Sequence, residues 1–338
     1  MTHHFSLSLT LTLSLLALSA CDESPLDTDP IALPGLTATA AASYSAQSLR
    51  ISGEAQTTAT SINTAGQVVG YWFREDDVFR GFIWKDGITT NLGTLGGSDS
   101  RAMDINEAGQ VVGFSQNAAG RTRAFRWMNG TMKALGTLGG NMSRAFGINN
   151  KSNVVGDSRL AGNTFTHAFL LKNGKMTDLG TLGGGNSSAV DINDAGQVVG
   201  WSETAAGVRH PFLWQNGIME DLLPPGLTVS CTAYAINPLG AVVGEKDQHA
   251  FRYYNGVMSN LAVLGAGPSN ATGIRNGRIV GHTAAGAFVL DGGVVTLLPL
   301  PPGQTFAEVL AVNAAGVIVG NTEDGETPFR TVTIWIPQ

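Results

Sequence analysis

One nine-residue motif recurs seven times along the chain and constrains its fold more than any other feature. In its fullest form the motif runs from Ile105 to Gly113 as Ile-Asn-Glu-Ala-Gly-Gln-Val-Val-Gly. Units repeated at a spacing of about 40 residues bury their apolar faces against one another. The chain is therefore expected to fold as one array of seven similar units. The last glycine of the motif recurs, in steps of 43, 43, 44, 44, 37 and 39 residues, at Gly70, Gly113, Gly156, Gly200, Gly244, Gly281 and Gly320.

Each unit predicts four short β-strands. In the third unit we expect strands at 143–149, 154–158, 167–171 and 175–179. The last two flank an Asn-Gly pair, which is a strong hairpin signal because both central residues of the tight turn adopt positive φ. No helical periodicity competes with this pattern. The same kind of turn is predicted at Asp86-Gly87, Asn129-Gly130, Asn173-Gly174, Asn216-Gly217, Asn255-Gly256 and Asp291-Gly292.

Four antiparallel strands in about 40–45 residues are typical of one blade of a β-propeller. An open solenoid is the less favoured alternative, because the rungs of a parallel β-helix are much shorter. The seventh unit ends near Trp335 without a fourth strand, and residues around Leu49 precede the first unit at the offset of a fourth strand. We therefore predict an all-β fold: a seven-bladed β-propeller with four antiparallel strands per blade and a ring closed by an N-terminal strand.

The N-terminal residues predict export. Residues 5–20 carry no charge but are short for a membrane span, which needs about 20 apolar residues. They end in Leu18-Ser19-Ala20-Cys21, which resembles the bacterial lipobox, although His3 and His4 stand where Lys or Arg is usual. The resemblance implies that the cysteine is acylated and becomes the new N-terminus. Ordinary secretion is the alternative.

These features divide the chain into three parts. We predict a signal peptide over 1–20, a lipidated Cys21 with an acidic, proline-containing tether over 21–34, and a propeller over 35–338. Four acidic residues and two prolines without periodicity, between Asp22 and Pro30, favour an extended tether. We expect an exported protein that is lipid-anchored in the bacterial cell envelope, on its periplasmic or cell-surface side, and meets the membrane through its N-terminal lipid.

The order of motifs within a unit resembles the bacterial extracellular HAF repeat family. His167-Ala168-Phe169 and His249-Ala250-Phe251 match the triplet that names the family, and the connection Leu92-Gly93-Thr94-Leu95-Gly96-Gly97 recurs at 135–140 and 179–184. Later units depart from this pattern, since proline-containing connections replace the glycine-rich one at 222–226 and 297–303. The resemblance implies an exported repeat protein and carries no catalytic residue.

Charge composition argues against nucleic acid as a partner. Charged residues make up 14% of the chain, against about 25% in an average globular protein, and the net charge is -6. Nucleic-acid binding relies on basic clusters that neutralise phosphates. We expect no nucleic-acid partner.

A row of cationic or imidazole side chains is the main candidate ligand site. These residues stand two positions before the Phe of the third strand in five units, so the fold should place them at one level around the ring. Such an arc could bind an anion or the carboxylate of a glycan. The alternative is that each side chain bonds the backbone of a neighbouring blade. The five residues are Arg80, Arg123, His167, His210 and His249.

Two tryptophans of the second strands, Trp72 and Trp201, are candidate sugar-stacking platforms. Glycoside hydrolysis would need two positioned carboxyl groups. Asp104 and Asp191 precede the repeat isoleucine in only two units, so we assign no catalytic residue. No paired metal-ligand spacing and no phosphate loop is present, so we expect no metal and no cofactor.

These observations favour a non-catalytic binding or scaffold module for protein or glycan, and not an enzyme. One alternative is a propeller-type lyase or hydrolase acting on polysaccharide or a lactone. A passive structural spacer is another. Carboxyl groups and a histidine that meet in the central channel would favour the enzyme, whereas a large apolar patch on one face would favour protein binding.

Overall fold

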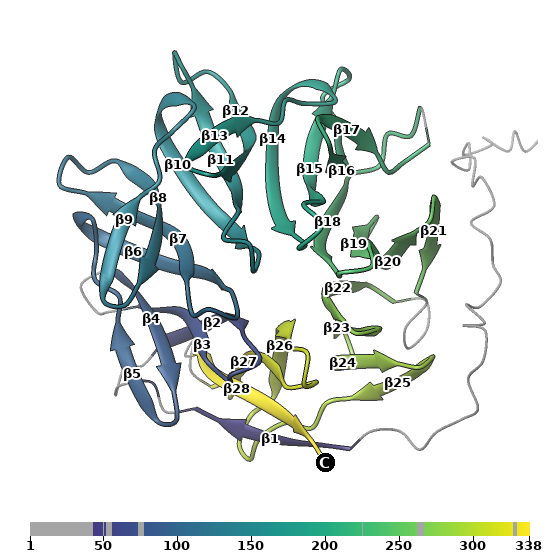
Figure 1. The fold of residues 1–338 in the computed structure, drawn as a ribbon. Helices are drawn as coiled ribbons and strands as arrows, with labels where there is room; N and C mark the ends of the chain where they lie inside the picture. The colour runs from purple at the N-terminus through teal and green to yellow at the C-terminus, as the bar shows by residue number, and fades with distance from the viewer. Residues whose placement is uncertain are drawn as a thin grey trace, which may run out of the picture.

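A computed structural model describes residues 43–338, except 50, 52–55, 74–77, 225, 262–266 and 327–329. The predicted signal peptide over 1–20, Cys21 and the tether over 21–34 lie outside the described residues. The described chain forms seven four-stranded antiparallel sheets arranged in a ring (Figure 1). The prediction of an all-β, seven-bladed propeller is confirmed.

The first four blades follow chain order, each running outward from a strand that lines the central channel. Blade 1 holds β2 (Gln56–Ile62), β3 (Val68–Phe73), β4 (Phe79–Lys85) and β5 (Ile88–Asn91). Blade 2 holds β6 (Gly96–Ile105), β7 (Val111–Asn117), β8 (Thr122–Met128) and β9 (Thr131–Ala134). Blade 3 holds β10 (Gly139–Ile148), β11 (Val154–Leu160), β12 (Thr166–Lys172) and β13 (Lys175–Asp178). Blade 4 holds β14 (Gly183–Ile192), β15 (Val198–Thr204), β16 (Arg209–Gln215) and β17 (Ile218–Asp221).

The last three blades complete the ring. Blade 5 holds β18 (Cys231–Ile236), β19 (Val242–Lys246), β20 (His249–Tyr254) and β21 (Val257–Asn260). Blade 6 holds β22 (Ser269–Arg275), β23 (Arg278–Thr283), β24 (Gly286–Asp291) and β25 (Val294–Leu297). Blade 7 holds β26 (Phe306–Val312), β27 (Ile318–Glu323) and β28 (Arg330–Pro337), and takes its outer strand, β1 (Tyr44–Ser48), from the N-terminal part of the chain.

This outer strand closes the ring as predicted. β1 pairs antiparallel with β28 from Tyr44 opposite Pro337 to Ser48 opposite Thr333 (Figure 1). The backbone N–H of Leu49 then donates to the carbonyl of Val332 at 2.8 Å. The last sheet is complete only because residues from both ends of the described chain share it.

Glycine is required where the second strand passes the bulged inner strand of its blade. Gly113 lies opposite Ala102, and the register shifts by one residue directly after that pair. A Cβ atom on Gly113 would lie 2.0 Å from the carbonyl oxygen of Arg101, which is far inside van der Waals contact. The motif glycine therefore permits the close approach of the two strands.

The hairpin between the third and fourth strands follows its turn signal in five blades. Asn129 and Gly130, for example, have φ values of 49° and 79°. Blade 6 differs from the prediction, because the two positive-φ residues are Gly292 and Gly293, and Asp291 instead pairs with Val294 as the last residue of the strand. The second glycine takes the turn position there because it adopts positive φ at no steric cost.

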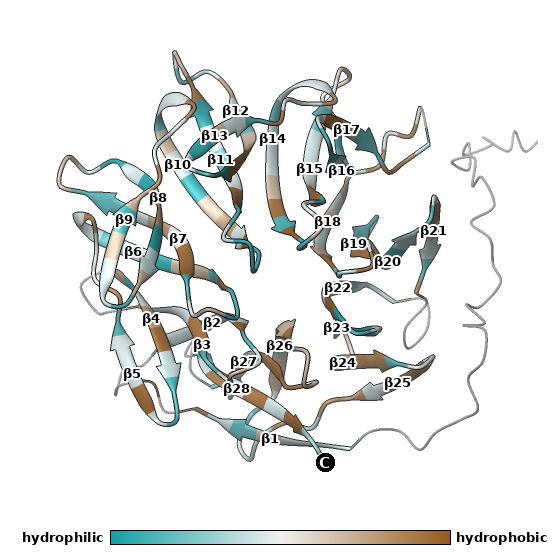
Figure 2. Ribbon diagram, in the orientation of Figure 1, coloured by the Kyte–Doolittle hydropathy of each residue, from teal (hydrophilic) through white to brown (hydrophobic). Residues whose placement is uncertain are grey.

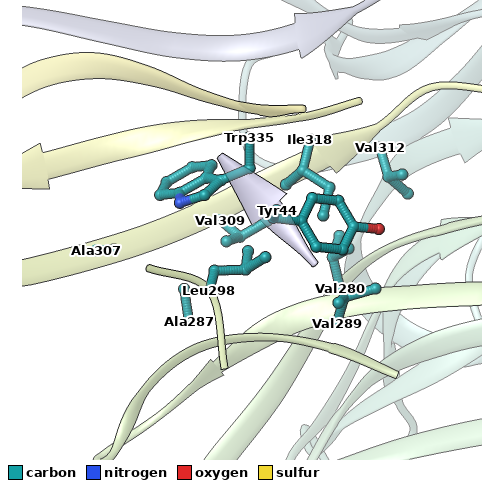
Figure 3. Packing of buried hydrophobic residues seen from close by; sticks show 10 residues of the cluster. All are labelled: Tyr44, Val280, Ala287, Val289, Leu298, Ala307, Val309, Val312, Ile318 and Trp335. Atoms are coloured by element: carbon teal, nitrogen blue, oxygen red, sulfur yellow. The ribbon is translucent and has the colours of Figure 1, made fainter. Parts of the chain in front are cut away.

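The hydrophobic core is divided among the spaces between blades. Figure 2 shows hydrophobic residues on the strands throughout the ring instead of in a single central layer. In the space between blades 6 and 7, Tyr44 of β1 packs beside Trp335 and Leu298 (Figure 3). The ring-closing strand therefore contributes a side chain to the core as well as hydrogen bonds to the sheet.

Candidate functional site

The inner strands of all seven blades line a central channel with a volume of about 520 Å³. Apolar and polar side chains both line it. Met103, Phe146 and Val190 of blades 2 to 4 and Leu310 of blade 7 are apolar, while blades 2 and 4 also contribute Asp104 and Asp191. We call four polar side chains of blades 5 to 7 the polar wall: Tyr234, Asn270, His282 and Glu308.

His282 is the histidine of this wall. Its Nε2 accepts a hydrogen bond from the Nδ2 of Asn270 at 3.0 Å, and its Nδ1 is buried without a hydrogen-bond partner among the described residues. Burial lowers the pKa of His282, while the charges of Glu308 and Glu245 partly oppose that shift. The ring is therefore neutral at physiological pH.

Two further side chains complete the polar wall. Burial, reinforced by the charge of Glu245 and a hydrogen bond with it, raises the pKa of Tyr234 to about 12, so the phenol stays protonated. Glu308 accepts a hydrogen bond from the guanidinium of Arg330 at 3.0 Å. The wall thus combines a hydroxyl, an amide, a neutral imidazole and a carboxylate, which together offer both donors and acceptors.

Asp104 and Asp191 also line the channel, and they link neighbouring blades. Asp104 accepts the N–H of Ile148 in the next blade at 2.8 Å and the hydroxyl of Ser61 in the preceding blade at 2.7 Å. Asp191 accepts the N–H of Ile236 at 2.9 Å. Burial and the nearby Asp191 charge raise the pKa of Asp104 to about 6, and burial also raises the pKa of Asp191. Every oxygen of these carboxylates is occupied, which favours a structural role.

The repeated asparagines form a hydrogen-bonded series around one end of the channel. Asn106 accepts the N–H groups of its own turn through Oδ1, and its Nδ2 donates to the carbonyl of Asn149 in the next blade at 3.1 Å. The turn bonds follow from the residue type, but the bond to the next blade does not. Blade 6 interrupts the series, because Arg275 replaces the asparagine and reaches towards Glu107 at 3.9 Å.

The predicted cationic arc lies at one register but away from the channel lining. The five residues pair across the second and third strands with Trp72, Ser115, Ser158, Ser202 and Lys246, respectively. Arg80 donates to the carbonyl of Ser98 and Arg123 to that of Asn141, both in the following blade. These two guanidinium groups are engaged by backbone, as in the alternative considered for the arc.

The histidines of the arc have partners too. His167 contacts the carboxylate of Asp178 at 2.9 Å, and His249 contacts the carbonyl of Asp247 at 2.7 Å. His210 is 3% exposed and bridges Asp221 and the carbonyl of Leu227. The structure therefore brings the five side chains to one level and gives each of them a hydrogen bond to a neighbouring protein group.

The two tryptophans have different environments. Trp72 is 5% exposed and stacks on Phe82, with ring centroids 5.8 Å apart. The expectation of an exposed sugar platform is wrong for Trp72, because its indole is part of the core between blades. Trp201 is half-buried, and the guanidinium of Arg209 lies 4.2 Å from its ring centroid.

The polar wall of the channel was not predicted from the sequence. Tyr234 occupies the register of Thr60, Met103, Phe146 and Val190. The available signal was the phenol of Tyr234 at this register in blade 5. It becomes meaningful only once the strand pairing shows that this position faces the channel. Within the described ranges, no group of three or more His, Cys, Asp or Glu residues is placed to hold a metal ion. The same residues include no helix with the length and apolarity to cross a membrane.

Solved structures similar to this chain are propellers, and the similarity in sequence is low. The β-propeller domain of the Trilobed protease from Pyrococcus furiosus aligns with a TM-score of 0.58 and 12% identity over 87% of this chain and 95% of that one. That domain is described as having an open velcro topology, whereas β1 closes the present ring. No family model and no curated protein matches the sequence.

Two other similar structures are peptidases. The Pyrococcus horikoshii acylaminoacyl peptidase aligns with a TM-score of 0.55 and 13% identity over 86% of this chain and 53% of that one. A puromycin-hydrolyzing peptidase from Mycobacterium tuberculosis aligns with a TM-score of 0.51 and 14% identity over 82% and 52%. The present chain thus spans about half the length of either peptidase.

These neighbours correct the expectation that the protein is not an enzyme. The expectation rested on the propeller architecture and on scattered carboxyl groups. Propellers of this shape occur within peptidases. The channel lining, moreover, includes Glu308, Asp104, Asp191 and His282. Neither the fold nor the distribution of carboxyl groups separates this chain from enzymes.

Proposed function

We propose that the central channel binds a small hydroxylated ligand, such as the end of a glycan chain, in a cell-envelope protein of the HAF repeat type. One observation carries the proposal: the polar wall and the apolar side chains of Met103, Phe146 and Val190 line one channel of about 520 Å³. Ligand sites commonly have volumes of about 300–1,000 Å³ and combine an apolar lining with a few convergent polar groups.

The polar wall and the apolar side chains of the channel suit the two kinds of surface that a sugar ring presents. Tyr234, Asn270 and Glu308 supply a hydroxyl, an amide and a carboxylate that suit an edge of hydroxyl groups. Phe146 and Met103 supply apolar surface for the C–H face of the same ring. A neutral His282 adds hydrogen-bonding capacity without a charge to repel cations or attract anions.

A second candidate function is acid–base catalysis on the same ligand, as in a lyase or hydrolase acting on polysaccharide or a lactone. Its specific support is the grouping of His282 with Glu245 and Glu308, whose charges both act on the imidazole, and of Tyr234 with Glu245. A neutral imidazole can accept a proton and a phenol can donate one. Product formation from labelled polysaccharides distinguishes catalysis from binding alone.

The sequence supports placing this site in the cell envelope. The uncharged run over 5–20 and the lipobox-like Leu18-Ser19-Ala20-Cys21 favour export and acylation, and the acidic tether over 21–34 would hold the propeller away from the membrane. A membrane-tethered propeller with an open channel is suited to capture glycans of the envelope.

The channel proposal is tested with the full-length chain in detergent on a glycan array, followed by calorimetric titration of each hit. We expect Tyr234→Phe to weaken binding about fivefold to tenfold, the effect of one lost hydrogen bond. Tyr254→Phe is the matched control. It also removes one phenol hydroxyl, but from the third strand of the same blade, where Tyr254 contacts Arg252. Equal affinities for the wild type and Tyr234→Phe would exclude the channel as the binding site.

A further inference from the structure

Three arginines in consecutive blades stack on aromatic rings on one side of the ring. The guanidinium carbon of Arg101 lies 3.8 Å from the ring centroid of Phe79, with Tyr71 and Phe114 at 5.3 and 5.7 Å. The guanidinium carbon of Arg144 lies 5.3 Å from the centroid of the Phe146 ring, and that of Arg209 lies 4.2 Å from Trp201. Stacking of this kind holds the planar guanidinium in one orientation.

Arg101 and Arg209 differ from Arg144 in what their N–H groups contact. Arg144 donates two hydrogen bonds to the carboxylate of Asp157, at 3.0 and 2.6 Å. Among the residues that the structure describes, neither Arg101 nor Arg209 has a carboxylate within 4 Å or a side-chain hydrogen bond. Asp99, two residues before Arg101 on the same strand, instead accepts the backbone N–H of Phe79 at 3.0 Å. Within the described ranges, two positive charges on this side therefore have no carboxylate in close contact.

These groups share the face of the ring that carries the hairpins between second and third strands. Phe79 and Arg209 each begin the third strand of their blade, directly after that hairpin. Tyr71, Phe73 and Phe79 also line, together with Arg330, a separate cavity of about 190 Å³. We call this region the arginine–aromatic surface; it comprises Tyr71, Phe79, Arg101, Phe114, Trp201 and Arg209.

We propose that the arginine–aromatic surface binds a carboxylated glycan, with the guanidinium edges of Arg101 and Arg209 as carboxylate receptors. A guanidinium fork matches a carboxylate through two parallel N–H···O bonds. The half-buried rings around Arg101 offer apolar surface to the sugar that carries the carboxylate. This site uses none of the channel residues. It would bind the anion that the sequence suggested for Arg80 and Arg123, which instead donate hydrogen bonds to backbone carbonyls of the following blade.

The test measures binding of a galacturonate tetrasaccharide to the full-length chain by calorimetric titration, beside its methyl ester and a sulfated oligosaccharide of equal length. We expect the free acid to bind and the methyl ester, which keeps the rings but loses the charges, to bind at least tenfold more weakly. Equal binding of the ester would overturn the carboxylate receptor. Tighter binding of the sulfated probe would replace the proposal with a general polyanion site.

Variants separate this receptor from general electrostatic attraction. Arg101→Gln and Arg209→Gln are each expected to weaken the free acid about tenfold. Arg101→Lys should lose a similar factor because an ammonium keeps the charge but not the planar fork. Arg121→Gln, which removes an exposed charge from the β7–β8 hairpin on the same face, should bind as the wild type does. Full affinity in Arg101→Lys would contradict the proposal even if Arg101→Gln failed to fold, and Tyr234→Phe should leave this binding unchanged.

Discussion

The side-chain amide of Asn313 donates to the backbone carbonyl of Asn63 at 3.0 Å, and so joins blade 7 to blade 1 across 250 residues of sequence. The same bond links blade 1 to 2, 2 to 3, 3 to 4 and 4 to 5. Each asparagine thus holds its own turn with Oδ1 and the next blade with Nδ2. A buried amide that satisfies two partners at once is costly to replace.

This double role predicts the effect of Asn149 substitutions on stability. Asn149 is 4% exposed, accepts the N–H groups of Lys151 and Asn153, and donates to Asn193 at 2.9 Å. We expect Asn149→Ala to lower the free energy of unfolding by about 2–4 kcal/mol, measured by urea denaturation. Asn149→Asp keeps the oxygen that accepts the turn N–H groups but loses the N–H that donates to Asn193 in the next blade. A free energy of unfolding equal to that of the wild type would show that this bond between blades contributes nothing.

Ring closure predicts a second effect on stability. Tyr44 of β1 is 8% exposed and packs in the core between blades 6 and 7 (Figure 3). Truncating a buried aromatic residue costs about 3–5 kcal/mol, so Tyr44→Ala should lower the free energy of unfolding by about 3 kcal/mol. Tyr254→Ala, at a half-buried position, is the comparison and should cost less. A loss no larger than that of Tyr254→Ala would mean that β1 does not seal the ring in solution.

At position 231 we expect a thiol to be more stable than the serine hydroxyl found in other blades. In blades 2, 3, 4 and 6 this position is a serine that accepts a backbone N–H from the preceding blade; Ser143, for example, accepts from Ala124 at 3.0 Å. The residue equivalent to Ala124 before Cys231 is Pro211, which has no N–H to donate. Cys231→Ser would bury a hydroxyl without this donor, and we expect it to lower the free energy of unfolding by about 1–2 kcal/mol.

The control for this prediction is Ser143→Ala, which leaves the Ala124 N–H without its acceptor and should cost about 1–3 kcal/mol. Cys231→Ala should cost less than Cys231→Ser if the missing donor is the reason. The reverse order would show that volume, and not hydrogen bonding, decides this position. Burial also raises the pKa of the Cys231 thiol to about 12, so slow reaction with a thiol reagent at neutral pH is expected until the protein unfolds.

Asp104 predicts a pH dependence of stability. Its pKa is raised to about 6 from 3.8, so between these values the native state holds a proton that the unfolded state releases. The resulting stabilisation is complete below about pH 4 and is lost as the pH rises through about 6. Asp104→Asn removes this titration, so its free energy of unfolding should vary less between about pH 4 and 7 than that of the wild type. Parallel pH profiles for the two proteins would contradict the assignment.

We expect acylation of Cys21 to attach the protein to the membrane. Cells that express the wild type and are fed an alkyne-labelled fatty acid should incorporate the label into this protein, and Cys21→Ser should abolish both the label and the membrane fraction. Cys231→Ala is the control that retains the lipobox-like cysteine. Label in Cys21→Ser would remove the basis for a lipid anchor.

Much of the fold was predictable because each repeat carries its own local instructions. The Asn-Gly pairs specify hairpins through positive φ, and the motif glycine marks the close approach of two strands. The missing fourth strand after Trp335 and the surplus segment around Leu49 together predicted the closure. The blade 6 turn at Gly292-Gly293 was misplaced by one residue because Asp-Gly and Gly-Gly overlap there, and only strand register decides between them.

The sequence by itself determined the number of blades, the strands within them and how the ring closes, because these depend on local turns and on a period that can be counted. The tertiary structure decided which side chains remain available for a ligand. The sequence suggested that Arg80 and Arg123 could bind a ligand, but both donate hydrogen bonds to the adjoining blade. Arg101, by contrast, stacks on Phe79 without a carboxylate partner within the described part of the chain. The physical reason is that the partners of a side chain in a propeller come mostly from the neighbouring blade, about 20 to 40 residues away, and no local pattern records whether a given polar atom has already been satisfied there.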